Sequence, residues 1–256
     1  MLQATPVHAE SARYATSLLF LPDLWAPARV WLAAATYFGH RGWEGELLEL
    51  RGTGDIAART AALVEHSRRL PRAPVLVGHG AGALVALRAA RACVASAVVL
   101  VAPLLPGSAG VRALTRRLDV LVSLLRGRPI PPPRAALARR IFGEVPAELD
   151  RETARAVLDV VRGKPAVECP LGIPTLVVAG EHDPLLHPPG GAALASALAA
   201  DFVEIPGAAH WPILAPGWQR TVGEVHRWLV RRLGEALLDF YAEAMAERDA
   251  GEPDDD

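Results

Sequence analysis

The stretch "PVLVGHGAGALVAL", residues 74–87, combines an apolar strand, a sharp glycine turn and the beginning of a helix. Gly78 and Gly82 frame the turn with the spacing of the G-x-S-x-G nucleophile elbow, whose middle residue is a serine. Here the middle residue is Gly80, which has no side chain. The elbow imposes a strained backbone that costs a non-glycine residue about 1–3 kcal/mol but costs glycine little. The sequence therefore predicts that the turn is kept and that its nucleophile is absent.

Apolar runs on both sides of this turn alternate with longer segments of helical spacing. Helices are predicted over 30–43 and 81–92 and in a long final segment from 216. Near-continuous apolar strands between helices indicate a parallel sheet that is covered on both faces. We therefore expect an α/β fold with a mostly parallel, twisted sheet and helices on both faces. The predicted strands lie within residues 17–21, 45–55, 74–78, 95–103, 173–183 and 201–210.

The pattern changes between residues 104 and 170. Short amphipathic helices are predicted there, interrupted by "RPIPPP" (128–133), and no strand fits. We interpret this segment as a helical cap over the strand ends, inserted into a core formed by residues 1–103 and 171–235. Residues 236–256 are then a helical extension with an acidic tail, which we expect to be disordered.

The final helix should pack on the sheet through one apolar stripe. Beyond Gly234 a second stripe follows, which fits either intramolecular packing or a dimer face. We therefore expect a monomer or a homodimer. The first stripe comprises Trp218, Val222, Val225, Trp228 and Leu229, and the second comprises Leu237, Leu238, Phe240 and Tyr241.

Composition narrows the class of partner. The chain has 27 basic and 28 acidic residues, and its arginines are scattered rather than gathered in a basic stripe, which argues against a nucleic-acid partner. No signal peptide or membrane span is visible. The two cysteines, Cys93 and Cys169, are expected to be free thiols of a reducing compartment. These features favour a cytoplasmic protein that binds a small molecule, with no metal or cofactor.

Two further motifs place an acid and a base after strands. Asp183 follows one strand in "GEHD" (180–183), and His210 follows another in "GAAHW" (207–211). Alone, Asp183 could be a turn residue and His210 a core histidine. Both fall at the carboxyl end of a strand, where sites of α/β sheets form, so we expect the two side chains to face each other.

Together with "FLPDLW" (20–25) and "LRGTGD" (50–55), these motifs stand in the order nucleophile, acid, histidine. In this the chain resembles the α/β-hydrolase superfamily, in particular small bacterial members with a helical cap, over roughly residues 15–232. The resemblance implies a catalytic His210–Asp183 pair, with Gly80 at the nucleophile position. It also implies an oxyanion hole formed by the amide of Ala81 and that of Asp23 or Leu24.

Four other polar residues near these motifs are expected to have no catalytic role. Glu181 and His182 are expected to be loop residues, and Asp55 is expected to cap the following helix. His79, inside the turn, is expected to pack away from the pocket.

Three functions are compatible with an elbow that lacks its serine. In the first, which we favour, His210 activates a water in the space left by the missing hydroxymethyl group and hydrolyses a small apolar ester-like or carbonyl substrate. In the second, the His–Asp pair moves a proton without hydrolysis, as in a lyase, cyclase or isomerase. In the third, the chain is a pseudoenzyme that binds a ligand or a partner. Fold alone does not choose among them.

Overall fold

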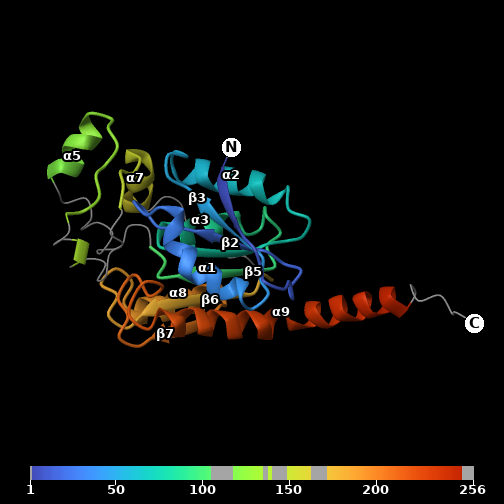
Figure 1. Ribbon diagram of the computed structural model, residues 1–256. Helices are drawn as coiled ribbons and strands as arrows, with labels where there is room; N and C mark the ends of the chain where they lie inside the picture. Colours follow the sequence, from blue (N-terminus) through green and yellow to red (C-terminus); the bar gives the residue numbers. More distant parts are fainter. Residues whose placement is uncertain (1, 105–117, 135–137, 140–148, 163–171, 250–256) are drawn as a thin grey trace, which may run out of the picture.

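The computed structural model describes residues 2–104, 118–134, 138–139, 149–162 and 172–249, which form a seven-stranded sheet with helices around it (Figure 1). The strand order is β1-β3-β2-β4-β5-β6-β7, and every neighbouring pair except β1–β3 is parallel. The predicted α/β fold with a mostly parallel sheet is confirmed. The strands are β1 (Gln3–Val7), β2 (Leu18–Leu21), β3 (Gly45–Glu49), β4 (Val75–His79), β5 (Ala97–Val101), β6 (Thr175–Gly180) and β7 (Asp201–Ile205).

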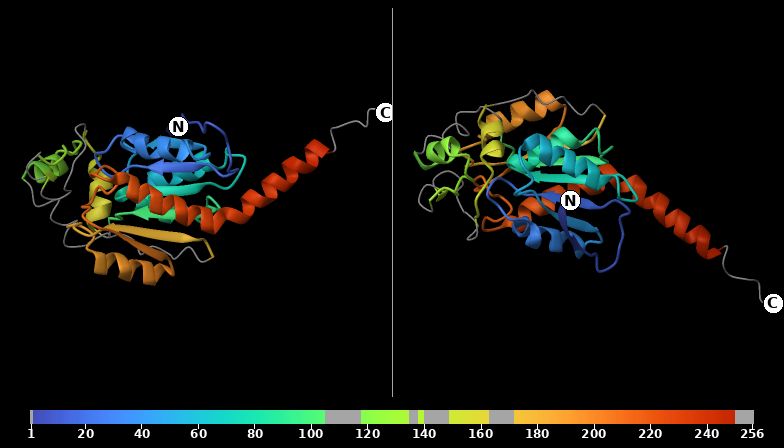
Figure 2. Two further views of the ribbon diagram at one scale, coloured as in Figure 1. Left: turned by 60° about the horizontal axis from the view of Figure 1, so that its bottom comes forward. Right: turned by 90° about the horizontal axis from the view of Figure 1, so that it is seen from above.

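The central strands explain why helices lie on both sides of the sheet. Every residue of β2, β4, β5 and β6 is buried, so both faces of these strands must be covered. Helix α2 packs against α3, and α1 packs against α9 (Figure 2). The helices are η1 (Ala28–Trp31, a 3-10 helix), α1 (Leu32–Gly39), α2 (Ile56–Ser67), α3 (Ala81–Ala89), α5 (Leu118–Leu125), α7 (Ala154–Arg162), α8 (Pro188–Leu198) and α9 (Trp218–Asp249).

Strand β1 was not predicted from the sequence. It pairs antiparallel with β3 at the edge of the sheet, in a register that joins Gln3 to Glu49. Its residues are exposed or only partly buried, and its sequence "QATPV" contains no continuous apolar run. The backbone hydrogen bonds of β3, rather than burial, therefore define this strand.

The segment between β5 and β6 carries helices α5 and α7, which lie at one end of the sheet (Figure 1). The described part of this segment contains no extended strand, only an isolated bridge between Ile130 and Glu152. The short helix predicted over "PRAALARRIFG" (133–143) lies largely outside the described residues, and Cys169 lies wholly outside them. Cys93 is a buried free thiol, as predicted.

Helix α9 packs on the sheet through the predicted first stripe. Val222, Val225, Trp228 and Leu229 are buried, and Trp218 is partly buried against the core. Beyond Gly234 the helix continues away from the sheet (Figure 1). The side chains of the second stripe lie outside the described residues, as does the acidic tail, so both remain predictions.

Asp55 caps helix α2, as the sequence predicts, through an Oδ1 atom that accepts a hydrogen bond from the Ala58 amide at 2.8 Å. Replacing it by alanine leaves that amide without its partner. We expect Asp55→Ala to lower the free energy of unfolding by about 1 kcal/mol, measured by urea denaturation. Asp55→Asn, which keeps a capping oxygen, is the matched control and should lose much less. Equal stability of all three proteins would contradict this assignment.

Candidate active site

The turn after β4 has the backbone geometry that the sequence predicts. Gly80 lies at φ 56° and ψ −117°, a conformation that favours glycine. Its amide donates to the Val101 carbonyl at 3.0 Å, and its carbonyl accepts from the Leu104 amide at 3.1 Å. A Cβ atom on Gly82 would overlap the Leu21 carbonyl, so this frame glycine lets α3 approach the end of β2. The turn is thus fixed by both of its neighbouring strands.

The side chain of Asp23 lies within the site. Its Oδ1 atom accepts hydrogen bonds from the amides of Leu24 and Ala81, each at 2.7 Å, and the residue is only 2% exposed. These are two of the amides proposed from the sequence as oxyanion donors. From the sequence, Asp23 is expected to contribute only its backbone amide. In the structure its carboxylate lies between the amides of Leu24 and Ala81 and accepts from both.

The carboxylate of Asp23 also fills the space beside Gly80. A Cβ atom on Gly80 would overlap Asp23 Cγ and both carboxylate oxygens. The expected space for a water in place of a serine hydroxymethyl group is therefore taken by another side chain. This corrects the sequence prediction, and its physical reason is that glycine at position 80 leaves room that the nearest short acid occupies.

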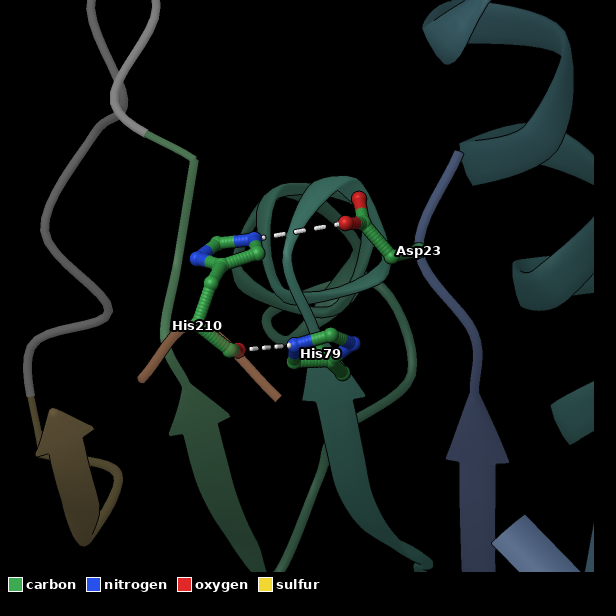
Figure 3. A group of neighbouring side chains, drawn as sticks. All are labelled: Asp23, His79 and His210. Atoms are coloured by element: carbon green, nitrogen blue, oxygen red, sulfur yellow. Dashed lines mark hydrogen bonds and ion pairs between the residues drawn. The ribbon is translucent and has the colours of Figure 1, made fainter. Parts of the chain in front are cut away.

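His210 lies between Asp23 and a second carboxylate. Its Nδ1 atom is 2.9 Å from Asp183 Oδ2. Its Nε2 atom is 3.4 Å from Asp23 Oδ2 (Figure 3). The remaining oxygen of Asp183 accepts from the amides of Leu185 and Leu186 at 2.7 and 3.0 Å. The predicted contact between His210 and Asp183 is thus present, and both side chains are fully buried.

The two carboxylates hold a proton on the histidine. Burial disfavours the imidazolium, but the charge and hydrogen bond of Asp183, together with those of Asp23, outweigh it and raise the pKa of His210 to about 9. Burial likewise opposes ionisation of Asp23, yet the hydrogen bond to His210, nearby positive charge and the Ala81 amide hold its pKa below the usual value. The resting site is therefore an imidazolium between two carboxylates.

This cluster links stability to pH. The pKa of His210 is higher in the folded protein than the ordinary value of 6.5, so its stabilising contribution is complete below about pH 6.5 and is lost as the pH rises through about 9.

His79 lies closer to this cluster than the sequence predicts. Its Nε2 atom is 2.7 Å from the backbone carbonyl of His210, and its ring centroid is 4.3 Å from that of Trp211. Burial lowers the pKa of His79 to about 4, so the ring is neutral and Nε2 carries the proton that it donates to the carbonyl. His79 therefore supports the backbone of His210 instead of packing away from it.

Asp23, His79 and His210 come from three different segments and place one potential metal-ligating atom each within 4.8 Å of the others (Figure 3). His79 Nε2 is engaged by the His210 carbonyl, and the oxygens of Asp23 are engaged by two amides and by His210. The charge of His210 already balances the carboxylates beside it. The group therefore has the character of an ion-paired cluster, and we assign no metal to it.

Of the two loop residues beside Asp183, Glu181 is exposed and accepts a hydrogen bond from the Gly207 amide at 2.7 Å, and His182 is exposed. Neither contacts the His210 cluster through the hydrogen bonds described, in agreement with the sequence prediction.

The loop that carries Asp23 is held by the segment between β5 and β6. Trp25, at the unusual φ of 62°, donates its amide to Glu152 at 3.4 Å and its indole N–H to the Ile130 carbonyl at 3.2 Å. The Trp25 carbonyl in turn accepts from the Asp150 amide at 2.9 Å. These contacts fix the backbone next to Asp23.

Glu152 also forms a buried ion pair with Arg59 of α2. This ion pair is not predicted from the sequence. Its only signal is that Arg59 shares the buried face of α2 with Ile56 and Leu63, where an arginine needs a partner.

Residues 18–220 match the model of the alpha/beta hydrolase family, a match that includes all the site residues above. This chain belongs to the alpha/beta hydrolase family. A search of curated protein sequences gave no significant match.

Solved structures agree on the fold. The chain is similar to the monoacylglycerol lipase of Paleococcus ferrophilus, with 19% identity, a TM-score of 0.67, and coverage of 91% of this chain and 99% of that one. It is also similar to a thermophilic esterase of Thermogutta terrifontis (19% identity, TM-score 0.69, coverage 90% and 93%). A third similar structure is the putative non-heme bromoperoxidase BpoC of Mycobacterium tuberculosis H37Rv, with 18% identity, a TM-score of 0.69, and coverage of 91% of this chain and 96% of that one. At these identities the likeness establishes the fold alone.

None of the helices in the described ranges is both long and apolar enough to cross a membrane.

The charge arrangement makes a direct prediction for Asp23→Asn. Because one of the two carboxylates that hold the proton on His210 is neutralised, the pKa of His210 should fall clearly below about 9. The measurement is an NMR pH titration of the histidine ring signals, with His210 assigned by its absence in His210→Gln. Glu65→Gln, which changes an exposed carboxylate paired with Arg69 on α2, should leave this titration unchanged. An unaltered pKa in Asp23→Asn would mean that the two groups do not interact in solution.

Proposed function

We propose that this chain is a hydrolase of a small, largely apolar ester-like or carbonyl compound. His210 is the general base, Asp183 orients it, and no serine acyl-enzyme is formed because Gly80 stands at the nucleophile position. The turn around Gly80 is, in this proposal, a nucleophile elbow that has kept its backbone and lost its nucleophile.

The observation that carries this proposal is the orientation of His210. Its Nδ1 atom is taken by Asp183, so Nε2 is directed to the Asp23 carboxylate, which lies beside Gly80 and accepts from the amides of Leu24 and Ala81. A histidine oriented by a carboxylate through Nδ1 can act as a general base through Nε2 once it has lost its proton, which its pKa of about 9 places at alkaline pH. We further propose that residues 104–170 act as a cap that lines the pocket, which the contacts of Asp150 and Glu152 with Trp25 support.

One observation favours the non-catalytic alternative. The amides of Leu24 and Ala81 already donate to Asp23. The positive charge of His210 is balanced by the carboxylates of Asp23 and Asp183. This arrangement is sufficient for a pseudoenzyme that binds a ligand or partner, because such a protein needs neither open oxyanion donors nor a free base. The same pair of carboxylates around a histidine would also serve proton transfer in a lyase or isomerase, so both alternatives are outcomes of the experiment below.

His210→Ala should lower the rate of hydrolysis by at least about 100-fold, because it removes the general base. The measurement is turnover of short-chain p-nitrophenyl esters and of enolisable ketones, with folding of each variant checked by circular dichroism. His182→Ala removes an exposed histidine from the loop beside Asp183, and this matched control should retain full activity.

Other outcomes separate the alternatives. Hydrolysis that persists in His210→Ala contradicts the proposal. Ketone chemistry that requires His210, without ester hydrolysis, would favour the lyase or isomerase. Tight ligand binding without turnover by the wild-type protein would favour the pseudoenzyme.

A further inference from the structure

A cleft lies between β1, the loop after β3 and helix α2, apart from the candidate active site. Its volume is about 510 Å³, within the range of about 300–1,000 Å³ that is usual for small-molecule sites. The residues described as lining it include none of Asp23, His79, Asp183 and His210. Polar and charged side chains dominate the lining, among them Gln3, Glu49, Arg51, Thr53, Glu65 and Arg69.

The carboxylate of Glu49 has no capacity left for a ligand. An ionised carboxylate offers about four lone-pair sites. Oε1 of Glu49 accepts from the amide of Arg51 at 3.1 Å and from its Nε atom at 3.0 Å. Oε2 accepts from the amide of Ala28 at 3.2 Å and from Nη2 of Arg51 at 3.1 Å. Glu49 therefore holds Arg51 in place and leaves no acceptor for a cationic ligand.

The remaining hydrogen-bonding capacity of the cleft consists largely of donors. Arg51 donates three of its five side-chain N–H groups, two to Glu49 and one to Asp150, so two N–H groups remain. Arg69 donates to Glu65 at 3.1 Å through a single nitrogen, Nη2. The charge of Glu65 is already balanced by Arg69 and by a second arginine of α2, Arg68. Donors around a cleft whose acids are already paired favour an anionic ligand.

The carboxylates that now pair with the two arginines of the cleft are weakly held. Asp150 is 70% exposed where it meets Arg51, and Glu65 is 59% exposed where it meets Arg69. Exposed ion pairs contribute little to stability, because water screens them and long side chains must be ordered. A carboxylate of a bound ligand can therefore take the place of Asp150 at Arg51 and join Glu65 at Arg69.

We propose that this cleft binds a small molecule with two carboxylate groups, one paired with Arg51 and the other with Arg69. A guanidinium group presents its N–H donors in a planar fork that matches a carboxylate. Two such groups in one cleft of this size select a ligand with an anionic group at each end. The hydroxyl of Thr53 and the amide of Gln3 supply further polar contacts along the same cleft. This site goes beyond the proposed function and does not depend on it.

Titration of the wild-type protein with succinate, glutarate and adipate at constant ionic strength tests the site. The measurement is the chemical shift of the backbone amides of Gly52 and Thr53 in heteronuclear NMR spectra. At least one dicarboxylate should give a saturable shift. Butyrate should bind at least about ten-fold more weakly, because a monocarboxylate pairs with only one arginine. The absence of a shift with all three dicarboxylates up to about 10 mM would overturn the inference.

Two neighbouring arginines of α2 provide a matched pair of variants. Arg69→Gln should weaken dicarboxylate binding about ten-fold, because it removes one charged partner of the ligand. Arg68→Gln also changes an exposed arginine paired with Glu65, but Arg68 is not among the residues described as lining the cleft, so this control should bind like the wild-type protein. An equal loss in both variants would mean a diffuse attraction to the charge of α2 and would overturn the inference.

Asp150→Asn tests the pairing with Arg51 in the opposite direction. It removes the carboxylate that competes with the ligand for Arg51 and keeps the backbone contact of residue 150 with Trp25. Dicarboxylate binding should tighten about two- to five-fold. Unchanged or weaker binding would contradict the pairing of the ligand with Arg51. All of these measurements follow binding rather than turnover, so their failure would leave the proposed function intact.

Discussion

The buried imidazole of His210 between Asp23 and Asp183 is the interaction on which the arrangement of the site depends. Each carboxylate gives one oxygen to two backbone amides and turns the other toward the histidine. A buried charge without a partner costs several kcal/mol, so each group is tolerated only because the others are present. The loops after β2, β6 and β7, which are far apart in the sequence, are thereby held in one arrangement.

A second buried ion pair fixes the same loop from its other side. Glu152, paired with Arg59, accepts from the amide of Trp25, two residues after Asp23. The conformation of Asp23 therefore depends on contacts with helix α2 and with the segment between β5 and β6, as well as on the turn at Gly80. Such support from neighbouring elements is what keeps a residue at an unusual backbone angle, as Trp25 is at φ 62°.

Much of this structure is readable from the sequence. Continuous apolar strands predict the parallel sheet, the glycine spacing predicts the turn at Gly80, and the positions of Asp183 and His210 at strand ends predict their contact. These features depend on local patterns. β1 escapes prediction because its polar residues form a strand only through hydrogen bonds to β3. The role of Asp23 escapes it because a sequence shows that a side chain is missing at position 80, but not which neighbour fills the room.

The mutual fit of Asp23 and Gly80 makes the two positions interdependent. A side chain at position 80 would overlap the carboxylate of Asp23, so a serine introduced there alone meets a filled site. Removal of Asp23 alone leaves its amides and His210 without their shared partner. Every single-residue path from this site to a serine at position 80 therefore passes through an intermediate that is less stable than this site. Such an arrangement, once acquired, is kept in place by its own geometry.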